Sequence, residues 1–373
     1  MNKILMLRPV VPPIPVEQKK RNLAMMLLSH YIKYDRLTEL CQLIDADETV
    51  KAIDVYIDVY DIMKSIYNED VESDKQYIIA SAVLNLAAHY RGYFKTRHGL
   101  WTRIFLVYSD ESNMFSHQQF VPEFGVSKKR AFDVETSKLI SSQLKLVEML
   151  CKYLNDIFFI KRTGSFITFT YGNIANSIRQ DPKYISILVS SSKYMYQIPA
   201  MAIGHRVYQL RPLKDSGVDN SVIITPTNAI LMYYNKLTPN SLAVQRMKDF
   251  NPRLLSLIWT FNGCDDKNIS MLTNITKTTA MIADAIREYK MINDYQSDIK
   301  YLYHAFKGVE TVATADMLDR RFKAIDLMYQ YMLYSHTIES KDMLWNCNLY
   351  DPKTVDEINL QYFSDNPLDM QNL

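Results

Sequence analysis

Three short apolar runs, separated by helical patterns, constrain the fold of this chain more than any other feature. They are AIDVYIDVYDIM at 52–63, RIFLVYSD at 103–110 and YISILVSSS at 184–192. Each is rich in β-branched and aromatic residues, which is typical of strands buried on both faces of a sheet. Helical patterns at 74–93 and 137–153 lie between them. Because parallel strands need such crossover helices, the alternation predicts an α/β fold, a mostly parallel sheet with helices on both faces.

The remaining patterns divide the chain into segments. Two further strand candidates, RVYQLRPL and SVIITPT, lie at 206–213 and 221–227, and helical spacing follows from 228 to about 335. Four prolines within residues 1–15 predict an extended arm, because proline fixes φ and has no backbone donor. We expect a Pro-rich arm with N-terminal helices at 1–49, an α/β core at 50–226, a helical subdomain at 227–345 and a polar C-terminal tail at 346–373.

Composition excludes several classes of protein. The formal net charge is only +2, which argues against a non-specific DNA coat. Glycine is scarce, at 9 of 373 residues, so few backbone loops can cradle a phosphate. The four cysteines form no CxxC pair, and no run of 18 apolar residues is present. We expect a soluble protein, made in the cytoplasm, with no membrane partner.

Polar residues follow the three predicted strands where an open α/β sheet carries its functional groups. They are Asp58 with Asp61, Asp110 with Glu111, and the serines at 190–192. Carboxylates at two adjacent strand ends suit a divalent cation, whereas hydroxyls are poor ligands for one. The same aspartates also fit turn positions at strand ends. Both interpretations remain open from spacing alone.

The order of these segments, over residues 50 to 289, resembles the flap endonuclease and bacteriophage 5′–3′ exonuclease family, which has a PIN-like fold. The family's first strand ends in an Asp before a helix, as YIDVYDIMKSIY does at Asp58. Its second strand also ends in an Asp, as FLVYSDES does at Asp110. Its basic arch is similar to PEFGVSKKRAF, which contains Lys128, Lys129 and Arg130. The resemblance implies two divalent cations held by several carboxylates.

Two later phrases of the family appear here without their acids. TYGNIANSI, at 170–178, stands where the family has Glu-Ala-Asp-Asp. VSSSKYMYQI, at 189–198, is similar to the family's Ser-Gly-Asp-Lys-Asp phrase, but Ser192 and Tyr194 replace both aspartates. The resemblance therefore predicts too few ligands for two cations, although a single Mg²⁺ could bind weakly to Asp58 and Asp110.

The family's helix-three-turn-helix is also degenerate. FNGCDDKNISMLTNITKTTAMIADAI, at 261–286, keeps Gly263 and Asn268 but has lost every later glycine of the motif. Side chains at those positions prevent the close approach of backbone N–H groups to phosphates. Lys267 stands where the family has an acid.

The leading hypothesis is a catalytically inactive nuclease-like scaffold that serves as a structural or assembly protein in an oligomer with other protein chains. Because the family is frequent in bacteriophages, we expect a virion component such as a neck or tail ring subunit, or otherwise a cytoplasmic protein. A divergent Mg-dependent nuclease is the alternative and would use Asp58, Asp110 and Glu111. Non-catalytic nucleic-acid binding is a third hypothesis, and its candidate residues are Lys128, Lys129, Arg130, Lys267 and Lys277.

Overall fold

The fold is that of a computed structural model, and everything below concerns the residues that it describes. These are 40–42, 44, 52–67, 77–96, 98–109, 115–125, 134–162, 184–201, 206–212, 222–225, 254–264, 267–272, 299–301, 303–304, 313–334, 351–364 and 368–373. Within them, no helix combines the length and the hydropathy needed to cross a membrane.

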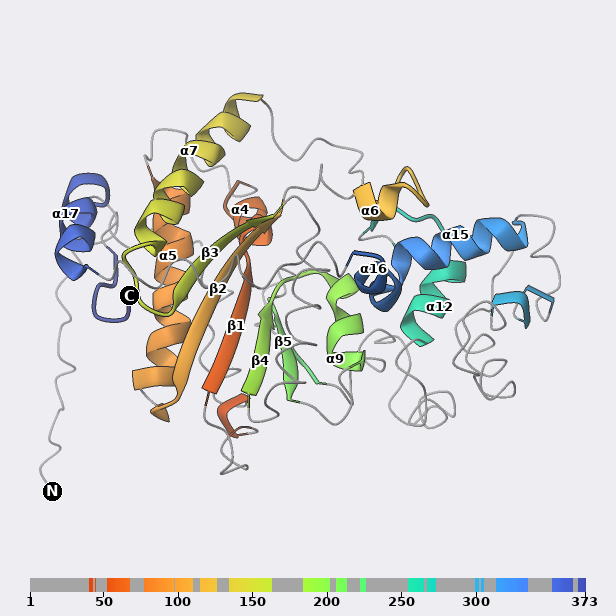
Figure 1. The fold of residues 1–373 in the computed structure, drawn as a ribbon, viewed down its shortest axis with the longest axis horizontal. Helices are drawn as coiled ribbons and strands as arrows, with labels where there is room; N and C mark the ends of the chain where they lie inside the picture. The colour runs from red at the N-terminus through yellow and green to blue at the C-terminus, as the bar shows by residue number, and fades with distance from the viewer. Residues whose placement is uncertain are drawn as a thin grey trace, which may run out of the picture.

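A six-stranded sheet forms the centre of the described part, in the order β3-β2-β1-β4-β5-β6 (Figure 1). All neighbouring strands are parallel except β6, which pairs antiparallel with β5. The mostly parallel α/β fold predicted from the sequence is therefore confirmed. The strands are β1(Ala52–Asp58), β2(Trp101–Ser109), β3(Ile157–Arg162), β4(Tyr184–Val189), β5(Val207–Arg211) and β6(Val222–Ile224).

Strand β3 is the one described strand that the sequence patterns did not predict. Its run, IFFIKR, begins six residues after the end of α7(Val134–Cys151). A short apolar run at that place cannot be distinguished from a continuing buried helix by periodicity. In the structure β3 lies at the edge of the sheet and pairs with β2 alone.

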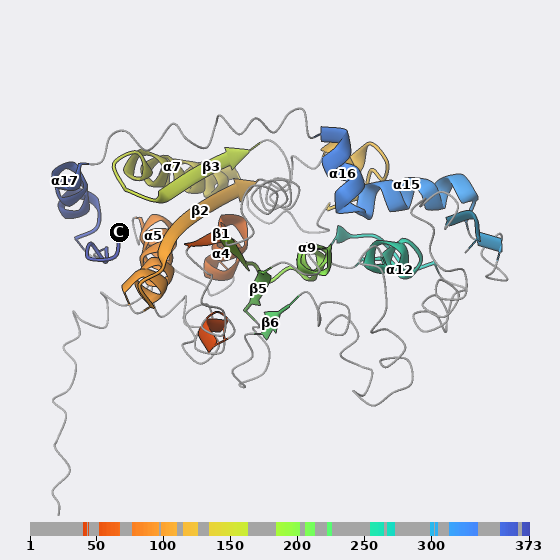
Figure 2. The same ribbon diagram turned by 60° about the horizontal axis from the view of Figure 1, so that its bottom comes forward.

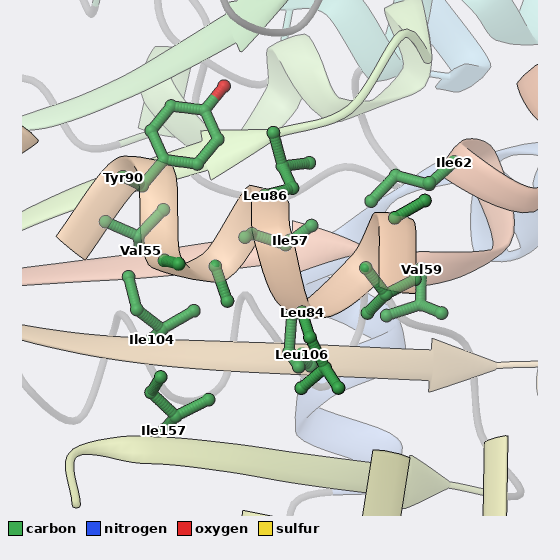
Figure 3. Packing of buried hydrophobic residues seen from close by; sticks show 14 of the residues in the cluster. Val55, Ile57, Val59, Ile62, Leu84, Leu86, Tyr90, Ile104, Leu106 and Ile157 are labelled. Carbon is green, nitrogen blue, oxygen red and sulfur yellow. The ribbon is translucent and has the colours of Figure 1, made fainter. Parts of the chain in front are cut away.

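The main hydrophobic core joins one face of the sheet to the helices that follow β1 and flank β2. Val55 and Ile57 of β1 and Ile104 and Leu106 of β2 point into it, together with Ile157 (Figure 3). The opposite face is buried as well, with stacked rings 4.8 Å and 5.2 Å apart along Tyr56, Phe105 and Phe158. Burial of both faces explains why these strands appear in the sequence as nearly continuous apolar runs. The helices on this core are α4(Val59–Tyr67), α5(Ile78–Arg91) and α7.

Helix α5 begins without a capping side chain of its own, since Tyr77 precedes it in the left-handed region at φ 65°. Gln143 of α7 supplies the cap instead. Its Oε1 accepts hydrogen bonds from the backbone N–H groups of Ile79 (2.9 Å) and Ala80 (3.2 Å). Two of the N–H groups that a helix start leaves without a partner are thereby satisfied from a neighbouring helix. The contact fixes how α5 and α7 lie on the sheet.

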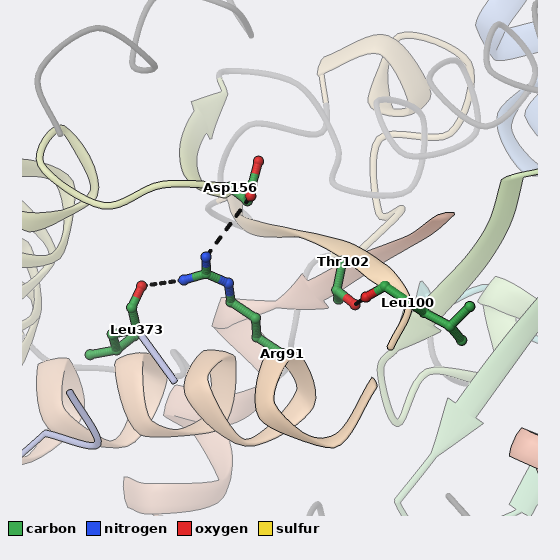
Figure 4. Close-up of polar contacts among 5 residues, drawn as sticks. All are labelled: Arg91, Leu100, Thr102, Asp156 and Leu373. Carbon is green, nitrogen blue, oxygen red and sulfur yellow. Dashed lines mark hydrogen bonds and ion pairs between the residues drawn. The ribbon is translucent and has the colours of Figure 1, made fainter. Parts of the chain in front are cut away.

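The C-terminal segment differs from the polar tail expected at 346–373. It contains α17(Pro352–Tyr362), whose Asp351 accepts hydrogen bonds from two N–H groups of its first turn. Val355, Ile358 and Phe363 are buried, so a few apolar side chains pack this segment on the core although most of its residues are polar. Arg91, at the end of α5, donates to the backbone oxygen of Leu373 and lies 3.9 Å from the Asp156 carboxylate (Figure 4). A nearby contact in the same view joins Thr102 Oγ1 to the Leu100 carbonyl at 2.9 Å.

A second group of helices lies beside β5, on the side of the sheet away from α17 (Figures 1 and 2). Short helical segments connect it to the sheet and to the turn at 119–125. Its members and connectors are α6(Phe115–Gln118), the 3-10 helix η3(Lys193–Tyr196), α9(Gln197–Met201), α12(Leu254–Asn262), α15(Ala315–Ile325) and α16(Leu327–Tyr334), while the π-helical turn η1(Gly92–Thr96) extends α5. Of this group, α12, α15 and α16 follow residue 228, where the sequence predicts helices, although only part of that region is described.

Candidate functional site

The carboxyl ends of β1 and β4 form the candidate site. Because the two strands are parallel neighbours, with Ile57 opposite Val189, the residues that follow them meet at the same edge. Ser190 Oγ donates a hydrogen bond to Asp58 Oδ2 at 3.0 Å. The backbone N–H of Asp61 donates to Asp58 Oδ1 at 3.2 Å, so Asp58 also caps the start of α4. Both oxygens of the Asp58 carboxylate thus accept hydrogen bonds from the chain.

The second acid of this site, Asp61, has a similar arrangement. The Ser191 backbone N–H donates to Asp61 Oδ2 at 2.7 Å, and the Ser191 hydroxyl donates to Asp61 Oδ1. Asp61 lies in the first turn of α4, where the helix dipole favours a negative charge. The serines that follow β4 therefore act as hydrogen-bond donors to the two acids that follow β1.

Two polar side chains of β5 hold the same serine loop from the other side. Gln209 Nε2 donates to the carbonyls of Ser190 (2.9 Å) and Ser192 (3.0 Å). Arg211 Nε donates to the Ser191 carbonyl at 2.7 Å. Sequence reasoning missed these two residues, and the available signal was a Gln inside an otherwise apolar strand. With them, the loop at 190–192 is fixed on both of its sides.

The Asp58 carboxyl has a pKa raised to about 7. Burial is the main cause, since a carboxylate loses its hydration there, and the neighbouring Asp61 carboxylate raises the pKa further. The hydrogen bonds from Asp61 N–H and Ser190, and the positive charge of Lys267, act in the opposite direction. At neutral pH the Asp58 side chain is therefore only partly ionised.

Tyr194 and Gln197, which follow the serine loop, connect the sheet to the second group of helices. Tyr194 stands at a position where the family resemblance implies an aspartate, yet it is wholly buried and its hydroxyl donates to the Ile325 carbonyl. Gln197 Nε2 donates to the same carbonyl at 3.1 Å, and its Oε1 accepts from Ser256 Oγ at 2.9 Å. These side chains hold the junction between α15 and α16, which is a structural task.

Lys267 is the only residue of the predicted nucleic-acid set that lies among the described residues. It belongs to a tight loop closed by the bridge between Cys264 and Ile269, whose backbone groups exchange hydrogen bonds of 2.8 Å and 3.1 Å. The Lys267 N–H also donates within the loop, to the Cys264 carbonyl at 3.0 Å. Gly263 is required before this loop, since its φ is +77° and an added Cβ would lie 2.4 Å from the Ile269 carbonyl oxygen. The N–H groups of Cys264, Lys267 and Ile269 are thus used inside the chain.

Several predicted site residues lie outside the described residues. They include the candidate acids of the second strand end and the remaining basic candidates, and their expected roles stay predictions. The residues are Asp110, Glu111, Lys128, Lys129, Arg130 and Lys277, together with the TYGNIANSI segment at 170–178.

The oxygen atoms that the described residues offer as metal ligands at this site do not fit a pair of divalent cations. Two such ions carry four positive charges, whereas the described edge offers two carboxylates whose oxygens already accept hydrogen bonds, and serine hydroxyls. Among the described residues, no group of three or more His, Cys, Asp or Glu side chains is placed to hold a metal ion.

Comparison with known proteins gives matches among solved structures. No protein-family model matches the sequence, and no curated protein matches it. The bacteriophage T5 D15 flap endonuclease, solved as a pseudo-enzyme–product complex with DNA and metal ions, is similar at 14% identity and a TM-score of 0.49 over 82% of this chain and 98% of that chain.

Two further solved structures are similar at lower identity. The T5 5′-exonuclease with bound zinc ions shares 12% identity at a TM-score of 0.48, over 83% of this chain and 99% of that chain. The catalytic core of Rad2 in complex with a DNA substrate shares 8% identity at a TM-score of 0.40, over 84% and 88%. These proteins include the flap endonucleases and 5′-exonucleases that the sequence motifs resemble.

Proposed function

We propose that this chain is a catalytically inactive, flap-nuclease-like scaffold that acts as a structural or assembly protein. The observation that carries the proposal is the arrangement of Asp58 and Asp61. Every oxygen of these two carboxylates accepts a hydrogen bond from a backbone N–H or serine hydroxyl of the same chain. A cation at this edge would have to share these oxygens with the donors and compete with the protonation of Asp58.

The positions next to these acids favour the same conclusion. Where a metal-dependent nuclease needs further hard oxygen ligands, this chain has Tyr194 in its core and Lys267, whose positive charge lowers the pKa of Asp58. Tyr194 is bonded to the α15–α16 junction, so its replacement of an acid stabilises the fold. Because the side chains at this site pack in the core or hydrogen-bond within the chain, the site supports a structural role better than a catalytic one.

The most specific form of the proposal is a subunit of a bacteriophage virion, such as a neck or tail ring. Its support is the Pro-rich arm at 1–15, which is suited to extended contact with another chain. Since α17 packs on its own chain, the N-terminal arm is the segment that we assign to assembly. Light scattering of the purified protein should give a molecular mass greater than that of one chain. Mass spectrometry should detect the protein in purified bacteriophage particles. A monomer that no particle contains would contradict the assembly role.

A nuclease assay tests the loss of catalysis. Wild-type protein is incubated with flap, 5′-overhang and single-stranded DNA in Mg²⁺ or Mn²⁺, beside Asp58→Ala and a control, Asp316→Ala, at an exposed position on α15. We expect no cleavage by any of the three. Cleavage by the wild type and by Asp316→Ala, lost in Asp58→Ala, would establish the divergent nuclease instead. Binding of DNA without cleavage, with an affinity that falls steeply as salt rises, would favour the nucleic-acid-binding hypothesis.

A further inference from the structure

The outward face of α7 carries a row of three exposed lysines, Lys138, Lys145 and Lys152, the last one residue beyond the end of the helix. Because seven residues make nearly two full turns, the three side chains line one side of the helix. Met149, 36% exposed, lies between two of them, and Glu148 at the margin of the row is half-buried. Within the described part of the chain, ion pairs join other side chains, so these ammonium groups have no acidic partner there. The α7 lysine row is therefore a positively charged surface with an exposed apolar side chain in it.

Helix α17 has an exposed face of the opposite charge. Its inner face packs on the main core, whereas Asp356, Glu357 and Leu360 are exposed. With 76% of its surface accessible, Leu360 is the most exposed large apolar side chain among the described residues. Lys353 is exposed on the same side, so the acids are in excess by one charge. This α17 acidic face thus also surrounds an apolar side chain with charges.

The two surfaces lie next to each other, at the end of the molecule away from the second group of helices (Figures 1 and 2). A backbone hydrogen bond connects the two elements, because the N–H of Asp351, the cap of α17, donates to the Tyr153 carbonyl just after α7 at 3.3 Å. Neighbouring surfaces of opposite charge are self-complementary. A two-fold rotation can place α7 of one copy on α17 of a second copy, and the reciprocal contact then forms by symmetry.

The spacing of side chains within the two surfaces also matches. We take Met149 and Leu360 as the apolar side chains that face each other across the contact. Each has a charged residue four positions before it, about 6 Å along the helix axis, and the α7 row and the α17 face each have another three positions away, about 4.5 Å. The lysine and acid brought together are Lys145 and Asp356 in a parallel approach, or Lys152 and Glu357 in an antiparallel one. Either direction therefore pairs opposite charges beside the apolar contact.

We propose that the α7 lysine row and the α17 acidic face form the interface between two copies of this chain in a two-fold dimer. The inference deepens the proposed function and rests on it, because it names one contact through which a structural protein would assemble and leaves the N-terminal arm for other chains. Exposed ion pairs are individually weak and are screened by salt. The dimer should therefore dissociate more readily as the salt concentration rises.

Charge reversal on each surface tests the interface. The α7 variant carries Lys145→Glu with Lys152→Glu, and the α17 variant carries Asp356→Lys with Glu357→Lys. In a dimer of either variant alone, both contacts bring like charges together, so its dissociation constant, measured by sedimentation velocity, should be at least about tenfold that of the wild type. In a mixture of the two variants, both contacts of a mixed dimer again join opposite charges. The mixed dimer should form with an affinity within about threefold of the wild type.

The matched control carries Lys300→Glu with Arg320→Glu. Both side chains are exposed and belong to neither α7 nor α17, and the change in net charge equals that of the α7 variant. The control should form dimers as the wild type does. Equal weakening in the control would assign the effect to net charge and would overturn the proposal.

Three further outcomes would also overturn it. They are a wild type that is monomeric at about 100 μM, a mixture of folded variants that stays monomeric, and an α7 variant that loses DNA binding with its mass unchanged, which would assign the row to nucleic acid. Should a variant not fold by circular dichroism, a wild-type dissociation constant that is equal at about 0.05 and 0.5 M salt would refute the ionic contact. A monomeric wild type that mass spectrometry nevertheless detects in particles would refute this interface and leave the assembly role standing.

Discussion

Restoring an acid at position 194 should destabilise the protein strongly, although the family resemblance places an aspartate there. The Tyr194 ring is wholly buried and contacts the rings of Trp259 and Phe124, with centroids 5.7 Å and 5.8 Å away. Replacing a large buried aromatic by a small residue costs about 3–5 kcal/mol of the free energy of unfolding. The new carboxylate would also be desolvated, which Lys267 would offset only in part. We expect Tyr194→Asp to lose about 4 kcal/mol or more.

Two companion variants separate the causes. Tyr194→Phe removes only the hydroxyl, and the Ile325 carbonyl still accepts from Gln197 at 3.1 Å, so we expect a loss of about 1 kcal/mol. Ser192→Asp restores the other missing acid at a half-buried position, where a change below about 1 kcal/mol is expected.

The assay is urea unfolding followed by far-UV circular dichroism, with the midpoint and the slope fitted for each variant. The expected order of stability is wild type, then Ser192→Asp and Tyr194→Phe close to it, and Tyr194→Asp far below. If Tyr194→Asp unfolds at the wild-type midpoint, or if Tyr194→Phe is as unstable as Tyr194→Asp, the reasoning that this position has become part of the core is wrong.

Three further predictions concern single contacts. The pKa of Asp58 is raised from its ordinary value to about 7, so the folded protein binds a proton there that the unfolded chain releases; the stabilisation by this proton is complete at low pH and is lost as the pH rises through 7. The melting temperature of Asp58→Asn relative to that of the wild type should therefore increase from pH 5 to pH 8, and a constant difference would contradict the assignment. In urea unfolding, Gly263→Ala should lower the free energy of unfolding by at least about 2 kcal/mol more than Gly99→Ala does. Both glycines have a positive φ, but only Gly263 has a carbonyl oxygen 2.4 Å from the added Cβ, so equal losses would exclude the steric explanation. Gln143→Leu should cost about 2 kcal/mol and raise the hydrogen-exchange rate at Ile79, because two N–H groups lose their acceptor; unchanged exchange would argue against the cap.

The sequence predicted those parts of the fold that depend on local composition. The runs that became β1, β2 and β4 were recognisable because strands buried on both faces are apolar throughout. The α/β class followed from the helices between them. Strand β3 was missed because its apolar run directly follows a helix, and helix α17 because its buried residues, such as Val355 and Ile358, are few within a polar segment.

The candidate site was predictable only in part, for a similar reason. The position of Asp58 at a strand end can be read directly from the sequence, as can Ser192 and Tyr194 at positions where the family that the chain resembles has acids. Their partners cannot, because the contacts join residues far apart in the chain. The hydrogen bond between the Tyr194 hydroxyl and the Ile325 carbonyl spans 131 positions. Lys267 was considered for contact with nucleic acid, whereas the structure places its ammonium within the chain, over the Tyr194 ring.

The pairing order of the sheet has a consequence for how the protein is made in the cell. Among the described strands, the central strand β1 is synthesised first, but its partner β4 emerges much later, since Ser190 and Asp58 are 132 positions apart. At translation rates of roughly 5–20 residues per second, the edge of β1 that pairs with β4 has no partner for about 7–26 s. During that interval an apolar strand with an open edge is exposed to other nascent chains. Slower synthesis would lengthen the exposure, so we expect the soluble yield to depend on chaperones that shield β1 until β4 arrives.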